Sequence, residues 1–338
     1  MRVALSGLNN SDNPAPGIGV AKSLPNVDLI GFAYEPTEPG IYQGLFKKVY
    51  MMPFPSMGYD VLADRLSQIQ KKDPIDLIIP NLDAELPLYI KHQDRIEKEF
   101  GIKSFLPTME QFESRDKTNL TDLCSFLKVL HPPTVEVVSI SEIRREAPKL
   151  GFPLFVKGKY YKAYKVYSVE EAIEAFMKII EEWGVPVLLQ KIVEGTEINL
   201  VGVSDGKRVV GSVAIKKLMI TELGKVWSAI TIKNDELDLV ADRFVLFTKY
   251  QGAFELECIA NNEGIYLIEI NPRFPAWVHF ATMVGVNLPS MLIELALGNS
   301  PKTKRTYPLE KMYVRYVEET CTDYDKFLQL LQRKEIGA

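Results

Sequence analysis

The first 105 residues alternate between short apolar runs and segments with helical periodicity. The apolar runs cover residues 2–6, 27–35 and 75–81, and the helical segments cover residues 59–73 and 84–101. Strands that alternate with helices form parallel sheets whose faces the helices cover. This pattern constrains the fold more than any other feature of the chain, and it predicts an N-terminal α/β domain over residues 1–105.

The remaining sequence changes character three times. Residues 106–132 have helical periodicity and are expected to form a connection. Residues 133–193 follow the order strand, helix, strand, helix, strand, with Ser139 and Ser168 at predicted helix N-caps. Residues 194–310 are rich in strands, including a hairpin that turns at Asp205-Gly206, and residues 311–338 form an extension. The expected fold class is therefore a combination of α/β and α+β domains.

Composition excludes several classes of protein. The formal net charge is −4, from 40 basic and 44 acidic side chains, which argues against a nucleic-acid partner. No apolar run reaches the roughly 20 residues of a membrane span, and the first residues do not resemble a signal peptide. The three cysteines, Cys124, Cys258 and Cys321, are too widely spaced for a disulfide framework or a zinc site. We therefore expect a cytoplasmic protein.

Acidic and amide side chains concentrate on one hairpin near the end of the strand-rich region. Its first strand carries Glu257 and its second strand carries Glu269 and Asn271, which alternate onto one face. Three oxygen ligands on one face suit Mg²⁺, which binds few protein oxygens and completes its shell with phosphates and water. Glu255 shares the face of Glu257 and is the competing ligand. A solvated face with incidental acids is the alternative interpretation.

Two lysines and one strand are candidates for nucleotide contacts. Lys157 follows the apolar run of residues 152–156, and Lys117 begins or interrupts a predicted helix after Asp116. Each lysine taken alone fits a surface side chain whose stem packs on apolar neighbours. The segment 190–197 offers strand backbone for a base and Glu197 for ribose hydroxyls, but a plain connecting strand fits it equally well.

The order of these segments along the chain resembles the ATP-grasp superfamily. An N-terminal α/β domain precedes "DK", "GFPLFVK", "VLLQKIVEGTEINL" and finally "EINPR", whose partner acid Glu257 lies 12 residues before Glu269. Members of that superfamily include biotin carboxylase, carbamoyl phosphate synthetase, D-alanine–D-alanine ligase and the pyrrolysine-pathway ligase. The resemblance covers residues 1–310. It implies an ATP-grasp fold with an N-terminal domain, a small mobile domain at 133–193 and a large β-rich domain at 194–310.

The resemblance also implies roles for individual residues. Mg²⁺ or Mn²⁺ would bind Glu257, Glu269 and Asn271, and Arg273 would act on the reacting carboxyl and phosphoryl groups. ATP phosphates would contact Lys117 and Lys157. The strand that holds the adenine would comprise Gln190, Lys191, Ile192 and Val193, and Glu197 would lie near the ribose.

One segment departs from the family pattern. Members usually follow the strand lysine with a glycine-rich loop that closes over the phosphates, but residues 158–168 here read "GKYYKAYKVYS". We expect Lys159, Lys162 and Lys165 to replace missing backbone amides as phosphate donors from one side of a turn. An exposed lid with a solvated basic face is the alternative.

The implied activity is that of a carboxylate–amine ligase. It would activate a substrate carboxylate as an acyl phosphate and join it to an amine, releasing ADP and phosphate. The partners would be a small molecule or peptide with a carboxylate and an amine acceptor, and a homo-oligomer is compatible with the sequence. Residues expected near the acceptor are Asn9, Asn10, Asp12, Trp277, His279 and Arg315.

Two other functions remain alternatives at the level of sequence. One is an ATP-binding protein of the same fold without ligase activity. The other is a dinucleotide-dependent oxidoreductase, suggested by Gly17 and Gly19 after the first strand and by Glu35 after the second. The full dinucleotide fingerprint needs a glycine where Lys22 stands, so this pattern is incomplete.

Overall fold

The computed structural model describes residues 1–9, 15–116, 119–158, 163–221 and 224–337. Its residues group into two compact units. Unit 1 comprises Met1–Phe112, Asn199–Glu255 and Asn271–Ala338, and unit 2 comprises Glu113–Ile198 and Leu256–Ile270. Each unit combines several of the ranges expected as separate domains, whose boundaries remain predictions.

A five-stranded sheet with the strand order β15-β3-β2-β1-β4 organises the N-terminal part of unit 1. Strands β1, β2 and β3 are parallel, as are β1 and β4, whereas β15 is antiparallel to β3. The bounds are Arg2–Leu5 for β1, Asp28–Ala33 for β2, Lys48–Met51 for β3, Leu77–Ile79 for β4 and Glu335–Gly337 for β15. The parallel α/β arrangement agrees with the sequence, but β3 and β15 were not expected.

Two amphipathic helices cover one face of this sheet. Helix α2 (Tyr59–Lys72) and helix α3 (Leu86–Phe100) bury their apolar stripes against Ala4 and Ile30 of the sheet. Gly101 ends α3 in the left-handed conformation with a φ of +70°, which favours glycine. The helix α1 (Pro16–Lys22) follows β1, and two short 3₁₀ turns, η1 (Pro39–Tyr42) and η2 (Pro55–Met57), follow β2 and β3.

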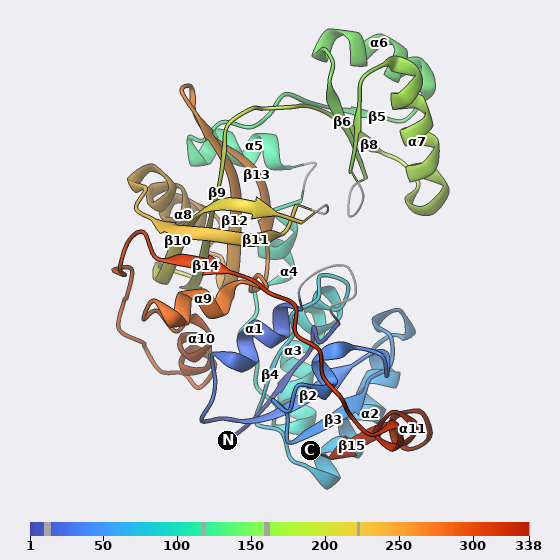
Figure 1. Ribbon diagram of the computed structural model, residues 1–338, viewed down its shortest axis with the longest axis vertical. Coiled ribbons are helices and arrows are strands. Elements are labelled where there is room, and N and C mark those ends of the chain that lie inside the picture. Colours follow the sequence, from blue (N-terminus) through green and yellow to red (C-terminus); the bar gives the residue numbers. More distant parts are fainter. Residues whose placement is uncertain (10–14, 117–118, 159–162, 222–223, 338) are drawn as a thin grey trace. The chain divides into compact units, whose positions relative to one another are not determined.

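Unit 2 contains a four-stranded sheet with the order β5-β8-β6-β7. Helices α6 (Ile140–Leu150) and α7 (Val169–Trp183) lie on one face of it (Figure 1). The hydroxyls of Ser139 and Ser168 accept hydrogen bonds from the third residue of each helix, so both predicted caps form. The strand bounds are Thr134–Val137 for β5, Leu154–Gly158 for β6, Ala163–Val166 for β7 and Val187–Lys191 for β8.

The helical connection expected over residues 106–132 is not one continuous helix. The structure has two helices there, α4 (Met109–Glu113) and α5 (Leu120–Leu127). The residues between them include Ser114, Asp116 and Asn119, whose side chains compete for backbone hydrogen bonds and favour turns over helix interiors. Lys128 ends α5 with a φ of +54°.

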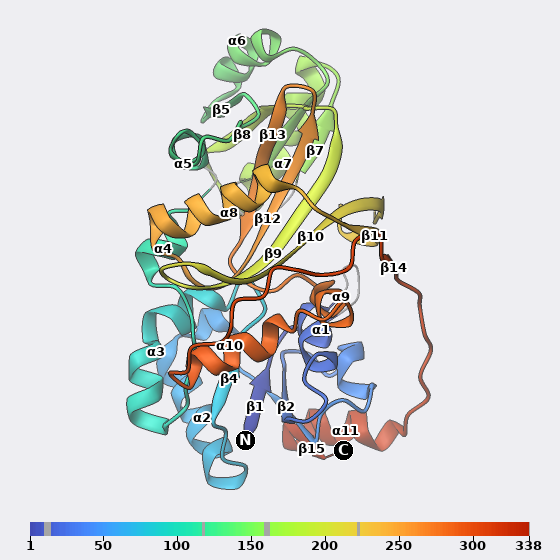
Figure 2. The same cartoon turned by 90° about the vertical axis from the view of Figure 1, so that its left-hand side faces the viewer.

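A six-stranded sheet has the order β13-β12-β9-β10-β11-β14. Strand β10 is covered on both faces by helices of unit 1 (Figure 2). Gly211 lies against Met291 and Leu288 of α10, and the next residue, Ser212, faces the side of α8. The bounds are Thr196–Asp205 for β9, Val209–Ile220 for β10, Val226–Ile232 for β11, Asp235–Thr248 for α8, Gln251–Asn261 for β12, Gly264–Asn271 for β13, Val278–Met283 for α9, Leu288–Ala296 for α10 and Met312–Val314 for β14.

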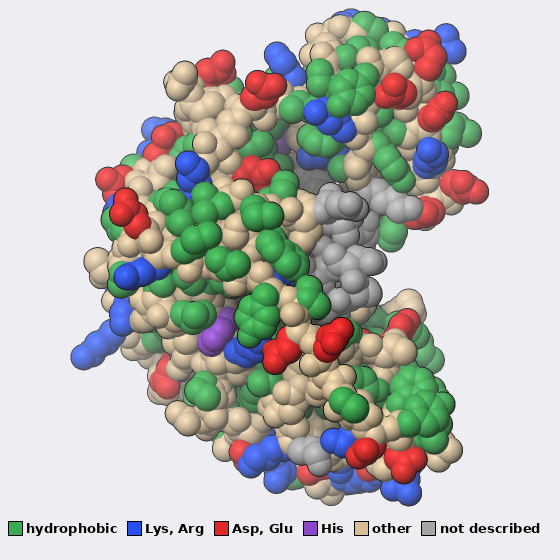
Figure 3. All heavy atoms as spheres, viewed as in Figure 1, with side chains coloured by type: hydrophobic (Ala, Val, Ile, Leu, Met, Phe, Trp, Pro, Cys, Tyr) green, Lys and Arg blue, Asp and Glu red, His purple; other side chains and the backbone are tan. Residues whose placement is uncertain are grey.

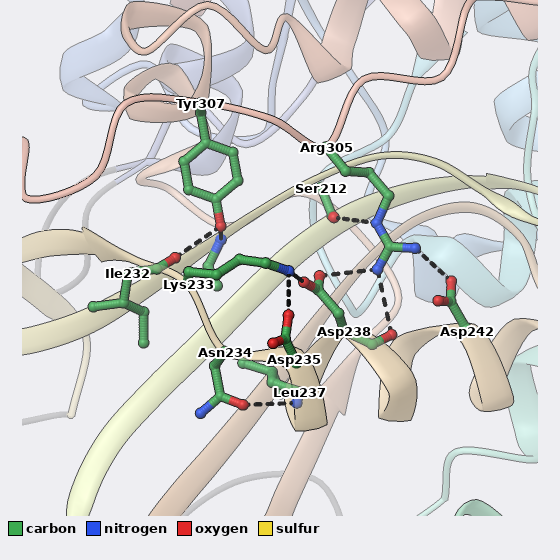
Figure 4. Close-up of polar contacts among 11 residues, drawn as sticks. Ser212, Ile232, Lys233, Asn234, Asp235, Leu237, Asp238, Asp242, Arg305 and Tyr307 are labelled. Carbon is green, nitrogen blue, oxygen red and sulfur yellow. Dashed lines mark hydrogen bonds and ion pairs between the residues drawn. The ribbon is translucent and has the colours of Figure 1, made fainter.

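The segment after α10 is anchored by Arg305. Its guanidinium donates hydrogen bonds to Asp242 at 2.6 Å, to Asp238 at 2.9 Å and to the Ser212 hydroxyl at 3.0 Å (Figure 4). The Tyr307 hydroxyl donates to the carbonyl of Ile232 at 2.9 Å. These contacts connect an otherwise irregular segment to α8 and to the sheet.

Helix α11 (Tyr324–Arg333) leads into β15. The carboxylate of Glu335 in β15 forms ion pairs with Lys72 at 2.9 Å and with Lys48 at 3.8 Å. Arg65 of α2 donates a hydrogen bond to the carbonyl of Lys334 at 2.6 Å. The extension expected at residues 311–338 therefore completes the N-terminal sheet.

Acidic and basic side chains are interspersed over the described part of the surface that Figure 3 shows. This mixture agrees with the small net charge of −4. In the part of the chain that the structure describes, no helix has the length and apolarity that crossing a membrane requires.

Candidate functional site

Lys157 lies near the end of β6 and faces a pocket inside unit 2. Its ammonium group donates a hydrogen bond to the side-chain oxygen of Gln190 on β8 at 2.7 Å. The two strands are antiparallel neighbours, with Phe155 paired to Gln190 and Lys157 paired to Leu188. The lysine side chain therefore reaches along the sheet toward a buried amide, which argues against a surface side chain that points into solvent.

A chain of hydrogen bonds continues from Gln190 to two residues that sequence reasoning missed. The Gln190 amide nitrogen donates to the hydroxyl of Thr134 at 2.9 Å, and that hydroxyl lies 3.3 Å from His131 Nε2. His131 Nδ1 lies 3.0 Å from the carbonyl oxygen of Leu267 on β13. Because its nitrogen is engaged by Thr134, the Gln190 amide must turn its oxygen to Lys157.

His131 is partly buried and lies against β13. Burial lowers its pKa below the ordinary value, and the nearby charge of Lys157 lowers that pKa further. The imidazole is therefore neutral at neutral pH, with Nδ1–H available to the Leu267 carbonyl, while the Thr134 hydroxyl donates to the Pro132 carbonyl at 2.8 Å. The only sequence signal for these residues is the tetrapeptide "HPPT", which predicts a helix break.

Glu269 lies on the same pocket as Lys157. The pocket is lined by Leu120, His131, Thr134, Lys157, Leu188, Gln190, Ile268 and Glu269. Apolar walls from Leu120, Leu188 and Ile268 adjoin one cation and one carboxylate. Such a mixture suits a ligand with a flat apolar part and an anionic part.

Glu257 lies on β12, the neighbour of β13 in the sheet, and is partly buried. In the described residues, no group of three or more His, Cys, Asp or Glu side chains comes together as a metal site would require. The expected ligand set contains two carboxylates and one amide, so it falls outside that kind of group. The assignment of Glu257, Glu269 and Asn271 remains a prediction.

Glu255 is buried in unit 1 and is held by three N–H donors. Asn199 and Trp277 donate to Oε1 at 2.8 and 2.7 Å, and Asn271 donates to Oε2 at 3.0 Å. The Asn271 amide nitrogen is therefore committed to Glu255, which leaves its oxygen to face elsewhere. Glu255 thus orients Asn271, and this role favours Glu257 over Glu255 as the upstream metal ligand.

Arg273 follows β13 and lies against the N-terminal part of unit 1. It forms an ion pair with Asp83 at 2.9 Å, and its side chain is only 13% exposed. The same guanidinium lies 3.4 Å from the Asn271 side-chain oxygen. Asp83 was not singled out from the sequence because it follows a three-residue strand whose neighbours are set by tertiary pairing alone.

The remaining nucleotide candidates divide into two groups. Gln190 and Lys191 belong to β8, where the Lys191 backbone nitrogen donates to the Pro133 carbonyl at 2.9 Å. Ile192 and Val193 follow the strand, and Glu197 lies in β9. Lys117, Lys159 and Lys162 lie outside the described residues. Lys165 lies in β7, so the expectation that it sits on a turn is wrong: residues 163–166 pair with β6 instead.

The residues expected near the acceptor lie in different surroundings. Trp277 is 3% exposed, and its indole nitrogen donates a hydrogen bond to Glu255. Its side chain is therefore part of the core. His279 is partly buried and lies 3.2 Å from the Ser23 hydroxyl, and Arg315 donates to the Tyr313 hydroxyl at 2.8 Å. Asn9 is exposed, whereas Asn10 and Asp12 lie outside the described residues.

A family model described as "ATP-grasp in the biosynthetic pathway with Ter operon" matches residues 184–320. The carbamoyl phosphate synthase large chain of Clostridium acetobutylicum is 22% identical over 254 residues, covering 71% of this chain and 24% of that protein. The corresponding protein of Thermotoga petrophila is 26% identical over 263 residues, covering 69% of this chain and 24% of that protein. The chain spans about a quarter of the length of these curated relatives.

Solved structures share the fold at low identity. The biotin carboxylase domain of 2-oxoglutarate carboxylase from Hydrogenobacter thermophilus has a TM-score of 0.68 and 16% identity, covering 92% of this chain and 73% of that chain. The L-amino acid ligase of Bacillus licheniformis has a TM-score of 0.64 and 17% identity, covering 89% and 75%. The expected ATP-grasp fold is confirmed, and residues 184–320 match an ATP-grasp family model.

Proposed function

We propose that this protein is an ATP-dependent ligase that activates a carboxylate as an acyl phosphate and transfers it to an amine. The observation that carries the proposal is the pocket of unit 2, where Lys157 is oriented by Gln190 and shares the wall with Glu269. A cation held in place beside a carboxylate matches the needs of a magnesium-bound nucleotide. The relatives and solved neighbours, which include carbamoyl phosphate synthase and an L-amino acid ligase, support the same class.

In this proposal Lys157 contacts the phosphates, and the apolar wall formed by Leu120, Leu188 and Ile268 takes the base. The backbone of Ile192 and Val193, which follows β8, reads the edge of the adenine. The Glu197 carboxylate accepts hydrogen bonds from the ribose hydroxyls. The lysine supplies a charge-assisted hydrogen bond without moving, because Gln190 already holds it.

The metal in this proposal is Mg²⁺, with Mn²⁺ as a substitute, held by Glu257, Glu269 and Asn271. Alternation along β13 places Glu269 and Asn271 on one side of the strand, and Glu255 turns the Asn271 oxygen away from itself. When bound, the ion neutralises charge on the transferring phosphates. The residues fit the group, because two carboxylates and an oriented amide oxygen are hard oxygen ligands.

The reaction has two steps. A carboxylate oxygen of the substrate attacks the γ-phosphorus, the bond to the bridging oxygen breaks, and ADP leaves. The nitrogen of an uncharged amine then attacks the acyl carbon, phosphate leaves with the bonding electrons, and the nitrogen loses a proton. Arg273 stabilises the negative charge that develops on the phosphoryl and carbonyl oxygens, and the protein otherwise positions the reactants.

Hydroxylamine trapping tests this function. The protein is incubated with Mg-ATP, hydroxylamine and a panel of amino acids and dipeptides, and acyl hydroxamate and ADP are measured. We expect at least one carboxylate to give both products in equal amounts. At limiting ATP, Lys157→Met should lower the signal, and Lys178→Met, an exposed lysine of α7, should retain it. Tight ATP binding without hydroxamate over the panel would favour an ATP-binding protein that lacks ligase activity.

The glycines that suggested a dinucleotide site have a packing role. A side chain at Gly17 would meet the Ser6 carbonyl oxygen at 1.9 Å, and one at Gly19 would meet the Ala276 carbonyl oxygen at 2.9 Å. Both positions therefore need glycine whether or not a ligand binds. This explanation favours the ligase over an oxidoreductase.

A further inference from the structure

Polar side chains gather where the parallel strands of the N-terminal sheet end. Ser6 follows β1, Tyr34 follows β2, and Asn81 follows β4. In the strand order β3-β2-β1-β4, strand β1 has β2 on one side and β4 on the other. The chain runs from β1 to β2 first and adds β4 on the opposite side later. Ligands of open α/β sheets bind outside the carboxyl ends of strands at this kind of switch point.

Glu85 is the centre of this edge. It is completely buried and accepts hydrogen bonds from the Ser6 and Tyr34 hydroxyls and from the backbone nitrogens of Asn81 and Leu82. These donors satisfy both carboxylate oxygens. Glu85 therefore fixes the shape of the loop from Asn81 to Glu85, and its role is structural.

Several acceptors around Glu85 are not satisfied. Among the described residues, the buried atoms without a hydrogen-bond partner include Glu38 Oε2, Asn81 Oδ1, Asp83 Oδ1 and the Tyr89 hydroxyl. Glu38, Asn81 and Tyr89 are 4%, 0% and 3% exposed. A buried polar atom without a partner costs about 1–3 kcal/mol, and native proteins contain few of them. Their concentration in one place indicates a missing donor.

Glu38, Glu85 and Tyr89 lie near Tyr34. The backbone nitrogen of Tyr34 donates to Glu38 Oε1 at 2.7 Å, and its hydroxyl donates to Glu85. Burial is the largest cause that raises the pKa of the Tyr34 hydroxyl. The nearby groups of Glu85, Tyr89 and Glu38 raise that pKa further. Asn81 uses its amide nitrogen on the carbonyls of Ile79 and Ser6, so only its oxygen is left.

The charge of this edge selects the kind of ligand. Asp83 pairs with Arg273 at 2.9 Å, and the carboxylates of Glu85 and Glu35 lie near Glu38. A phosphate or carboxylate would meet repulsion here. An ammonium group carries one positive charge and three N–H donors, which matches the unsatisfied oxygens.

We propose that Glu38, Asn81 and Asp83, with the Tyr89 hydroxyl beside them, form the subsite that binds the ammonium group of the amine substrate. This inference rests on the proposed ligase function. The Asp83–Arg273 ion pair places the subsite next to the arginine that acts on the acyl phosphate. The substrate class is therefore a primary amine such as an amino acid or a peptide N-terminus, which binds as the ammonium ion and loses a proton to solvent before it attacks.

The first test needs neither ATP nor a known substrate. The thermal unfolding midpoint of the whole protein is measured in methylammonium chloride and in tetramethylammonium chloride at equal ionic strength. Methylammonium offers N–H donors and tetramethylammonium offers none. We expect a midpoint about 1–4 °C higher in methylammonium, the scale of ligand stabilisation near saturation. Glu38→Gln should remove this difference, and Glu35→Gln, an exposed acid of the same segment, should keep it.

The second test uses the half-reaction. Hydroxylamine is uncharged at neutral pH, so hydroxamate formation does not need the ammonium subsite. In Glu38→Gln the Michaelis constant for the amine should rise roughly tenfold or more, the scale of a lost charge-assisted hydrogen bond, with hydroxamate formed at the wild-type rate. If Glu38→Gln does not fold, Tyr89→Phe removes one hydroxyl and should raise that constant about threefold.

The outcomes separate this inference from the proposed function. Equal midpoints in the two salts for the wild-type protein, or a Glu38→Gln variant that responds as the wild type does, would overturn the ammonium subsite. Hydroxamate formation together with either result would leave the ligase function standing. Conversely, a midpoint difference that Glu38→Gln removes, without any hydroxamate, would support an amine site in a protein that is not this ligase.

Discussion

The pocket of unit 2 and the carboxyl edge of the N-terminal sheet are both polar sites, but they differ in how their groups are satisfied. In the pocket, Lys157, Gln190, Thr134 and His131 bind one another in a continuous chain. At the sheet edge, Glu85 is fully bonded while Glu38 and its neighbours keep buried oxygens without partners. The pocket is therefore organised before a ligand arrives, and the edge is completed by one. Variants of the pocket should accordingly change nucleotide binding and turnover. A variant of the sheet edge should change how the stability of the protein depends on pH.

The largest effect is expected for Glu269→Gln. The change removes a negative charge from the proposed metal site with almost no change in shape, so ATP turnover should fall roughly 100-fold or more. ADP formation is measured against magnesium concentration, with Glu263→Gln at the exposed tip of the same hairpin as the control. A variant that keeps the wild-type rate at limiting magnesium would remove Glu269 from the metal site.

Lys157→Met should act on nucleotide affinity alone. Loss of a charge-assisted hydrogen bond costs about 1–3 kcal/mol, which corresponds to about a 5- to 150-fold higher dissociation constant. Calorimetry with a non-hydrolysable ATP analogue measures it, and Lys178→Met provides the matched control. Unchanged affinity would show that the lysine serves only the packing of β6 against β8.

Glu38→Gln should change the pH dependence of stability. Burial raises the pKa of Glu38 from 4.5 to about 7, so its neutral form is favoured in the folded protein. That stabilisation is complete below pH 4.5 and is lost as the pH rises through about 7. The wild type should therefore lose on the order of 3 kcal/mol relative to Glu38→Gln across this range.

Urea unfolding of both proteins at several pH values, with Glu97→Gln, an exposed acid of α3, as the control, measures this difference. Parallel stability curves for the wild type and Glu38→Gln would mean that the carboxyl is solvated, and the contrast between the two regions would then disappear.

Thr134→Val is expected to have the smallest effect. Valine keeps the shape of threonine but removes the hydroxyl that accepts from Gln190. The Gln190 amide can then rotate and release Lys157, at a cost of about 0.5–1.5 kcal/mol in ATP affinity. Thr121→Val, on the exposed side of α5, is the control. If Lys157→Met and Thr134→Val have additive effects, the two residues act independently and the chain of hydrogen bonds does not position the lysine.

Local patterns predicted the elements whose signals lie within a few residues. The caps at Ser139 and Ser168 and the turn at Asp205 depend on neighbouring side chains, and all three form. Strand β7 was not predicted because residues 163–166 carry charged and aromatic side chains and gain their strand structure from pairing with β6. Strand β15 is only three residues long, and its partner β3 is distant in sequence.

The same distinction holds for the candidate site. Family motifs singled out Lys157 and Glu269, and the structure places both on one pocket. His131 and Thr134 lie on that pocket without any motif, because their roles depend on β8 and β13 approaching one segment. Trp277 was expected to contact a substrate, but its indole serves Glu255 in the core. Sequence spacing does not distinguish an aromatic side chain that faces a substrate from one that orients a neighbouring carboxylate.

The pairing of β15 with β3 also bears on how the protein is made. Strand β3 lies at one side of the N-terminal parallel strands, and β15 pairs with it along Lys48, Val49 and Tyr50. During synthesis β3 emerges early, but its partner follows only after nearly all the described residues have been translated. Until then its unpaired backbone groups can add a strand from another chain, which is a common route to aggregation. The nascent protein is therefore expected to depend on chaperones until residues 335–337 leave the ribosome.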